Sequence, residues 1–165
     1  MTEDKTKKEE AKEKQPKLGK KEIPKVNPEK AHFASVSVKN LPISTKQSVE
    51  IAKYLMGRQL NKSKLFLQNV IDKKSAVPFK RYNRDVGHKP GKIAAGRYPE
   101  KSAKHFLMLL NSLEANAENK GLDVDNLKLS EVIANKGPGQ WHYGRLRRRK
   151  MKRTHLEIKA VEIEK

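Results

Sequence analysis

The ten residues GRLRRRKMKR, numbers 144–153, constrain the fold of this 165-residue chain more than any other segment. Seven of the ten are cations, namely Arg145, Arg147, Arg148, Arg149, Lys150, Lys152 and Arg153. In a strand, side chains alternate between two faces, and cations would fall on both. In a helix, cations would occur on every side. Because neither regular structure gives this segment an apolar face, it cannot be buried against its own protein.

The excess of positive charge is concentrated in two parts of the chain. The net charge is +19, from 38 basic and 19 acidic residues. Residues 32–96 hold 13 basic and 3 acidic residues, and residues 132–165 hold 10 and 3. Residues 97–131, between them, hold 5 and 6. This distribution indicates basic surfaces on a domain, for which nucleic acid is the expected partner. A membrane is not expected, since no segment pairs a basic face with a wide apolar one.

The N-terminal segment differs in composition from the rest of the chain. Residues 1–31 are rich in Lys and Glu and have almost nothing to bury, so we predict a disordered extension there and one domain over residues 32–165. The segment lacks the apolar stretch of a signal peptide, and no apolar run approaches transmembrane length. The chain has no cysteine, which excludes disulfides and cysteine-based zinc sites and fits a cytoplasmic location.

Three segments have the pattern of strands. Residues 32–40 alternate, with Ala34, Val36 and Val38 on one side, and residues 127–137 and 154–163 are also strand-like, the last with an expected bulge or change of burial near Ala160. If the second and third segments pair antiparallel, the centre of their connection lies near residue 145. Gly144 lies there and suits a tight turn. The cationic segment would then form the projecting end of a long hairpin.

Three helices are also predicted. The first starts at Ser44, whose spacing to Gln47 fits a capping box, and Gly57 ends it. The second is predicted to have Asn61 as its cap. The third runs from Pro99 to Gly121 and forms the core helix; its apolar side chains recur at helical spacing at Ala103, Phe106, Leu107, Leu110, Leu113 and Ala117.

The predicted hairpin end has the chemistry of a nucleic-acid-binding arm. Its like charges repel one another, so we expect it to be mobile when free and to order on a ligand that carries many phosphates. Trp141, His142 and Tyr143 precede the arginines and can stack on unpaired bases, which is more typical of RNA than of duplex DNA. The alternative is a solvated tail or a localisation signal.

A second basic segment, PFKRYNRDVGHKPGKIAAGR, spans residues 78–97. Its Pro and Gly content argues against regular structure, and loops of this length in a compact domain are usually functional. A solvated surface loop is the alternative. His88 in this loop is predicted to be a polar residue or a phosphate contact rather than a metal ligand. The loop contains one acid, Asp85, against the cations Lys80, Arg81, Arg84, Lys89, Lys92 and Arg97.

The sequence offers no catalytic constellation. The acids of residues 32–96 are too scattered for a two-metal nuclease site. Glu114 and Glu118 precede Asp123 and Asp125 and could bind a cation, although a solvated helix face is the preferred interpretation. There is no phosphate-cradling Gly-rich loop. We therefore expect no enzymatic activity, no metal and no cofactor.

Three blocks of the sequence resemble a known family: AVPFKRYNRDVGH, AAGRYPEKSAKHFLMLLNSLEANAENKGLDVDNL and NKGP, in this order. The family is the large-subunit ribosomal protein numbered twenty-two in bacteria and seventeen in eukaryotes, in its archaeal and eukaryotic branch, and the similarity runs from about His32 to Ile163. The resemblance implies an α+β fold with a small antiparallel three-stranded sheet, three helices packed on it and a long projecting basic β-hairpin. It also implies binding to large-subunit rRNA and a hairpin that helps to line the polypeptide exit tunnel.

Site residues carry over from this resemblance by position. The rRNA-contacting loop of the family falls on residues 80–97, including Gly87 and Gly96, and its hairpin falls on residues 136–153. Within these segments the predicted rRNA-binding residues are Lys80, Arg81, Tyr82, Asn83, Arg84, His88, Lys89, Lys92, Arg97, Lys136, Trp141, His142, Tyr143, Arg145, Arg147, Arg148, Arg149, Lys150, Lys152 and Arg153. The segment between NKGP and the last strand is several residues shorter than in the family, so we predict an arm that docks through its arginines and protrudes less into the tunnel.

These observations together predict a non-catalytic structural protein of the cytoplasmic large ribosomal subunit, which binds large-subunit rRNA and supports its assembly. Its expected partners are large-subunit rRNA, neighbouring large-subunit proteins and the nascent polypeptide, and no homo-oligomer is expected. A free nucleic-acid chaperone or DNA-compacting protein would share the charge but would not need the family blocks. An RNA-processing enzyme lacks candidate residues.

Overall fold

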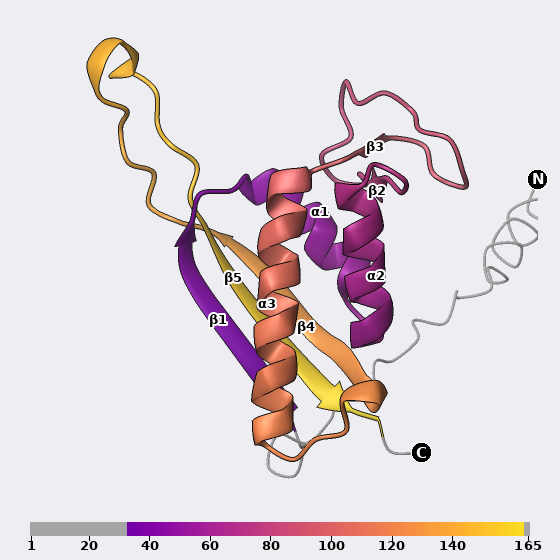
Figure 1. The fold of residues 1–165 in the computed structure, drawn as a ribbon. Coiled ribbons are helices and arrows are strands. Elements are labelled where there is room, and N and C mark those ends of the chain that lie inside the picture. The colour runs from indigo at the N-terminus through magenta and orange to yellow at the C-terminus, as the bar shows by residue number, and fades with distance from the viewer. Residues whose placement is uncertain (1–32, 164–165) are drawn as a thin grey trace, which may run out of the picture.

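A three-stranded antiparallel sheet forms the base of the molecule (Figure 1). The computed structural model describes residues 33–163, and the predicted disorder of residues 1–31 lies outside them. The strands follow the order β1-β5-β4, with β5 in the centre. Their bounds are Phe33–Leu41 for β1, Leu127–Lys136 for β4 and Thr154–Glu162 for β5. The predicted α+β class and the small three-stranded sheet are confirmed.

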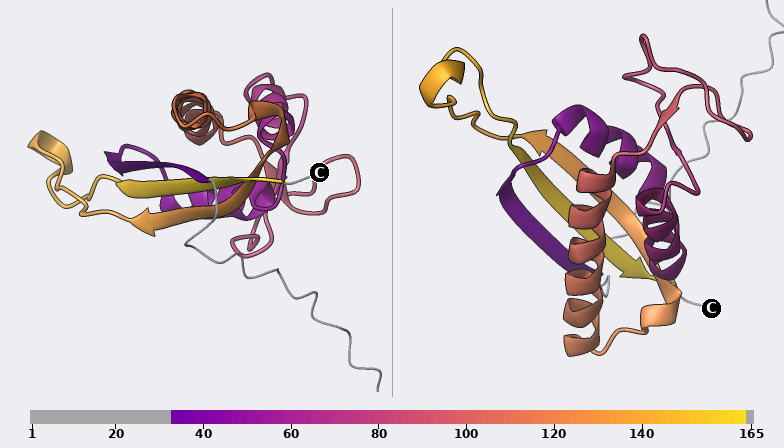
Figure 2. Two further views of the ribbon diagram at one scale, coloured as in Figure 1. Left: turned by 90° about the horizontal axis from the view of Figure 1, so that it is seen from below. Right: turned by 45° about the horizontal axis from the view of Figure 1, so that its top comes forward.

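Three helices cover one face of this sheet, as predicted. They are α1 (Thr45–Leu55), α2 (Leu60–Ile71) and α3 (Glu100–Asn119), and the 3₁₀ turn η3 (Val124–Asn126) leads from α3 into β4. Figure 2 shows α2 and α3 on the same side of the sheet. α3 contacts β5 and β1, and α1 and α2 contact β4. In the central strand β5, Leu156, Ile158 and Ala160 are buried while Glu157 and Lys159 are exposed. The helices therefore share one apolar core with a single face of the sheet.

The irregularity expected near Ala160 lies on the neighbouring strand. Leu129 pairs with Ala160 and Glu131 pairs with Lys159, so Ser130 is the extra residue of a bulge in β4. The bulge allows Leu129 and Val132 both to face the core although three positions separate them. A bulge within β5 itself, as expected from its sequence, is therefore wrong, since the pairing of β5 is continuous around Ala160.

Two predicted helix caps are wrong in detail. Ser44 is the N-cap of α1, but its side chain makes no capping hydrogen bond, and the Gln47 Oε1 accepts instead from the Ser102 hydroxyl at 3.4 Å. The second helix begins at Leu60 with Gln59 as its N-cap, not with Asn61. Gln59 forms a β-bridge with Lys128, so this helix start is set by pairing with β4, which local sequence does not reveal.

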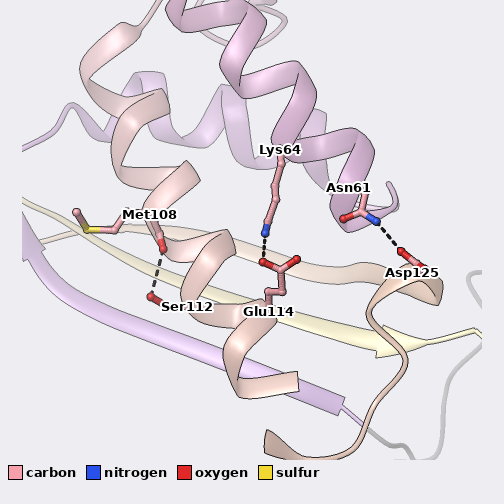
Figure 3. A network of polar contacts seen from close by, with 6 residues as sticks. All are labelled: Asn61, Lys64, Met108, Ser112, Glu114 and Asp125. Carbon is pink, nitrogen blue, oxygen red and sulfur yellow. Dashed lines mark hydrogen bonds and ion pairs between the residues drawn. The ribbon is translucent and has the colours of Figure 1, made fainter. Parts of the chain in front are cut away.

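Polar contacts join α2 to α3 and η3, as Figure 3 shows. Lys64 forms a partly buried ion pair with Glu114, and the Asn61 side chain donates to Asp125 at 3.0 Å. The solvated face predicted for Glu114 is thus wrong, because α2 covers it. Both acids stabilise helix packing, and no group of His, Cys, Asp or Glu within residues 33–163 could hold a metal ion. In the same part of the chain, no helix is long and apolar enough to cross a membrane.

Candidate nucleic-acid interface

The connection between β4 and β5, residues 137–153, projects beyond the sheet, and we call it the arm (Figure 1). The continuous ladder ends at the pair Lys136–Thr154. Beyond it, the strands of the arm touch at intervals: the Gly137 N–H donates to the Arg153 carbonyl at 2.8 Å, and the Met151 N–H donates to the Gln140 carbonyl at 2.7 Å.

The tip of the arm turns as the sequence predicted. A 3₁₀ turn, η4 (Gly144–Leu146), forms the tip, and Gly144 has a φ of +65°, in the left-handed region that glycine adopts most readily. Below the tip, Trp141 forms an isolated bridge with Lys150. A long regular β-hairpin over residues 136–153 is nevertheless not confirmed. Pro138 has no N–H to donate, and the dense like charge opposes close pairing of the two sides.

The side chains of the arm face solvent. Trp141 is 60% exposed and Tyr143 88% exposed, which leaves both rings open for stacking. The Lys150 Nζ lies 4.5 Å from the centroid of the Trp141 ring. Among the described residues, no cation of the arm forms an ion pair with a carboxylate. The arm therefore presents uncompensated positive charge beside exposed aromatic rings.

The base of the arm is tied to the entrance of α1. Thr154 is fully buried; its hydroxyl donates to the Ile43 carbonyl at 3.0 Å and lies 3.0 Å from the Thr45 hydroxyl. A Cβ added to Gly137 would meet the Arg153 Cβ at 3.0 Å, so the two sides of the arm approach closely at this level. The arm thus leaves the domain from a fixed point.

The second basic segment is a closed loop. The short strands β2 (Val77–Pro78) and β3 (Gly96–Arg97) pair antiparallel and bring its ends together. Inside it, the N–H groups of Phe79 and Lys89 donate to the carbonyls of Ala95 and Ala94, each at 2.9 Å. Phe79 and Ala95 are buried. We call residues 79–97 the basic loop. Hydrogen bonds between its own backbone groups hold its conformation, and its cations are exposed or half-buried.

One buried carboxylate, which sequence reasoning missed, fixes the start of the basic loop. Glu50 on α1 is 2% exposed, and its Oε1 accepts from the N–H groups of Arg81 and Tyr82 at 2.8 and 2.7 Å. Its Oε2 accepts from the Lys80 N–H at 3.1 Å. The available signal was that Glu50 is the sole acid between residues 32 and 71, in a helix otherwise patterned for burial. The buried Glu50 carboxylate thus fixes the backbone of residues 80–82, while the side chains of Lys80 and Arg81 are exposed to solvent.

A cleft lies between the basic loop and the base of the arm, and we call it the loop–arm cleft. Its volume is about 330 Å³. The start of α1, the basic loop and the arm all contribute to its walls, which are formed by Ser44, Lys46, Gln47, Phe79, Arg81, Tyr82, Arg84, Arg97 and Lys152. Five of these residues are cations and none is acidic. Lys46, which was not predicted as a site residue, belongs to this group.

A second hollow lies on the other side of the basic loop, where it meets α1. Its volume is about 540 Å³, and Lys53, Arg58, Lys80 and Lys92 contribute to its walls, together with Tyr54 and Glu50. The Arg58 guanidinium stacks 3.7 Å from the centroid of the Tyr54 ring, and its Nε donates to the Tyr54 carbonyl at 2.8 Å. Lys53 and Arg58 were also missed, because each is an isolated cation in the sequence.

The predicted site residues thus fall into three groups. Arg81, Tyr82, Arg84, Arg97 and Lys152 line one cleft, and Lys80 and Lys92 line the second hollow. The remaining predicted residues line neither: they are Asn83, His88 and Lys89 of the basic loop, Lys136 at the end of β4, and the other cations and aromatic residues of the arm. Most predicted residues are exposed; Tyr82, Lys89, His142 and Arg153 are half-buried.

Comparison with known proteins gives one consistent result. The family model described as "Ribosomal protein L22p/L17e" matches residues 36–161. The large ribosomal subunit protein uL22 of Ignicoccus hospitalis is 40% identical over 153 residues, covering 87% of this chain and 95% of the relative. That of Nanoarchaeum equitans is 47% identical over 140 residues, covering 79% of each chain. That of Cenarchaeum symbiosum is 50% identical over 103 residues, covering 61% and 67%.

Proposed function

Because this chain belongs to the ribosomal protein L22p/L17e family of structural, non-enzymatic ribosomal components, we propose that it binds large-subunit rRNA through the basic loop and the arm. The family places the protein in the large ribosomal subunit. The chemistry of the basic loop and the arm supports the proposed rRNA contacts.

The observation that carries the proposal is the position of the two segments. Both extend from the same end of the domain, away from the η3 end (Figure 1). The loop–arm cleft lies between the basic loop and the base of the arm, to which Lys152 belongs, and no acidic residue lines it. Arginine guanidiniums suit the bidentate contacts that phosphates accept, and the exposed Trp141 and Tyr143 offer rings to unpaired bases. A surface of this kind suits a site where several RNA segments converge.

The arm is the part proposed to reach furthest into the particle. We infer that its arginines dock on rRNA, that its tip lies near the polypeptide exit tunnel beside neighbouring large-subunit proteins, and that it passes close to the nascent polypeptide. The dense charge of the tip supports RNA docking more than free protrusion into the tunnel. A density map of the native particle tests this part, and a tip that extends across the tunnel without rRNA contact would contradict it.

Fractionation of ribosomes tests the proposal as a whole. We expect the protein to co-sediment with the large subunit in a sucrose gradient and to remain there after a high-salt wash, because many simultaneous phosphate contacts inside a folded particle dissociate slowly. A free nucleic-acid chaperone would leave the large-subunit fraction under the same wash. A variant with Arg81, Arg84 and Arg97 changed to Gln should be incorporated poorly, whereas a variant with Lys62, Lys101 and Lys104 changed to Gln, which lie on exposed helix surfaces, should be incorporated normally.

A further inference from the structure

We propose that the loop–arm cleft binds a single RNA phosphodiester and that this phosphate locks the arm to the basic loop. The inference rests on the proposed function and adds to it a defined subsite with a mechanical consequence. Its first support is the lining of the cleft, in which Lys46, Arg81, Arg84, Arg97 and Lys152 come from three separate parts of the chain. Five cations around one small cleft repel one another unless an anion lies between them.

The positive charge in the cleft is uncompensated by the protein. Among residues 33–163, none of these five cations forms an ion pair, since the four ion pairs of that part of the chain involve other lysines. Glu50, the nearest buried acid in the fold, already accepts three backbone N–H groups of the basic loop. No carboxylate lines the cleft or pairs directly with its five cations among the described residues.

The start of α1 adds backbone donors to the same cleft. Ser44 makes no side-chain capping bond, and the first turn of α1 contains no acidic residue. Within the described part of the chain, no acceptor is bonded to the N–H groups of Thr45, Lys46 or Gln47. Free first-turn N–H groups and the positive end of the helix dipole favour an anion, and here they coincide with the cation cluster.

Three of the five cations of the cleft, one on α1 and two in the basic loop, lie beside aromatic rings. The Lys46 Nζ lies 5.7 Å and the Arg81 Cζ 5.4 Å from the centroid of the Tyr82 ring. The Arg97 Cζ lies 5.9 Å from the centroid of the buried Phe79 ring. A cation already held by a ring loses less side-chain entropy when it binds an anion. All five cations of the cleft are exposed, but Lys46, Arg81 and Arg97 lie beside a ring, whereas Lys152 on the arm does not.

The difference between the two walls gives the locking effect. Arg81, Arg84 and Arg97 belong to a loop that Glu50 fixes to the domain, but Lys152 belongs to the arm. A phosphate that contacts Lys152 and the loop arginines at once joins the arm to the domain. By linkage, binding of the phosphate orders the arm, and an ordered arm binds the phosphate more tightly. An RNA phosphodiester is the occupant that fits, because the cleft opens beside the arm, which carries further cations and rings for the rest of a nucleotide chain.

Solution NMR of the full chain tests the inference, with hexauridylate and inorganic phosphate as separate probes. We expect hexauridylate to give saturable shifts of the Thr45, Lys46 and Gln47 amides and slower hydrogen exchange of the Gly137 and Met151 amides. The variant Lys152→Gln should weaken binding about tenfold and abolish the change in exchange. The matched variant Lys62→Gln removes the same charge from an exposed position of α2 and should leave the shifts at α1 in place.

Each other outcome overturns the inference. If Lys152→Gln and Lys62→Gln weaken the α1 shifts equally, the cations act through overall charge and the cleft is not a site. If inorganic phosphate shifts these amides but hexauridylate does not displace it, the occupant is a free anion and not RNA. If neither probe shifts them while the chain still binds large-subunit rRNA, the subsite is wrong and the proposed function stands. If the chain binds no rRNA at all, both fail.

Discussion

Glu50 connects the buried core to the most positively charged loop of the domain. A buried carboxylate is unfavourable unless its oxygens are hydrogen-bonded, and here three consecutive N–H groups of residues 80–82 serve both oxygens. The same bonds bend the loop so that the side chains of Lys80 and Arg81 point to solvent. The carboxylate thus orders the backbone without neutralising the cations through direct ion pairs.

Replacing Glu50 by Gln should loosen the start of the basic loop. The amide nitrogen would face a backbone donor in place of an acceptor, so we expect a loss of about 1–3 kcal/mol in the free energy of unfolding. Urea denaturation measures this loss, and hydrogen exchange should quicken at the amides of residues 80–82. Glu118→Gln removes the same charge at an exposed position of α3 and should leave stability within about 0.5 kcal/mol of the parent. Equal effects of the two changes would contradict the anchoring role.

Thr154 makes a comparable connection at the base of the arm. Its buried hydroxyl serves both the Ile43 carbonyl and the Thr45 hydroxyl. Thr154→Val keeps the shape but leaves these groups unsatisfied, so we expect a cost of about 1–2 kcal/mol. A double-mutant cycle with Thr45→Val separates the coupling between the two threonines from the loss at Ile43. Strict additivity of the two changes would show that the threonines do not interact.

At the level of elements, the sheet is closed at its edges while the arm extends freely. The turn between α1 and α2 covers the edge of β4, where the Gly57 N–H donates to the Leu129 carbonyl at 2.8 Å and the Leu129 N–H donates to the Arg58 carbonyl at 2.9 Å. On the opposite edge, side chains of α3 cover β1: Asn116 donates to the Ser35 carbonyl and Lys120 to the Phe33 carbonyl. Covered edges leave the arm as the extended backbone most open to a partner.

Gly139 should be essential to the path of the arm but not to the fold. A Cβ at this position would lie 3.0 Å from the Met151 carbonyl oxygen, and because that atom is backbone, the two sides of the arm must move apart. We expect Gly139→Ala to quicken hydrogen exchange at the Met151 amide and to weaken rRNA binding. The free energy of unfolding should change by less than about 0.5 kcal/mol, since the arm lies outside the core.

Gly87→Ala provides the comparison for that experiment. An added Cβ at Gly87 has no heavy atom within 4 Å, and its φ is not in the left-handed region, so the arm should be unaffected. If Gly139→Ala instead lowers the free energy of unfolding by several kcal/mol, the arm is part of the cooperative folding unit and does contribute to global stability.

The elements could be predicted where one periodic pattern decides them. The strand of Ala34, Val36 and Val38 and the core helix around Phe106 and Leu113 follow directly from alternation and from helical spacing. The cap at Gln59 and the bulge at Ser130 could not be predicted, because pairing with another strand fixes each of them. The irregular upper half of the arm likewise depends on the balance between backbone pairing and charge repulsion.

On the scale of the whole molecule, the two most positively charged segments lie together at one end of the domain. The cations of the basic loop and the arm lie at one end, and α3 with its mixed charge lies along the body of the domain (Figure 1). The sequence identified both basic segments, because each is a dense local run. It did not reveal the loop–arm cleft, because Lys46, Arg97 and Lys152 are far apart along the chain and only the fold brings them to one place.

This separation predicts how rRNA binding responds to salt. Each phosphate contact contributes about 0.7–0.9 to the slope of log affinity against log salt concentration, through release of counterions. If Arg147, Arg148 and Arg149 each contact a phosphate, changing all three to Gln should reduce the slope by about 2–3. Fluorescence anisotropy of a labelled large-subunit rRNA fragment, titrated at several salt concentrations, measures the slope.

Changing Lys62, Lys101 and Lys104 to Gln alters the net charge equally but on exposed helix surfaces, and should leave the slope nearly unchanged. If both triple variants reduced the slope to the same extent, RNA binding would depend on total charge alone, and the three arginines of the arm would not contact phosphates directly.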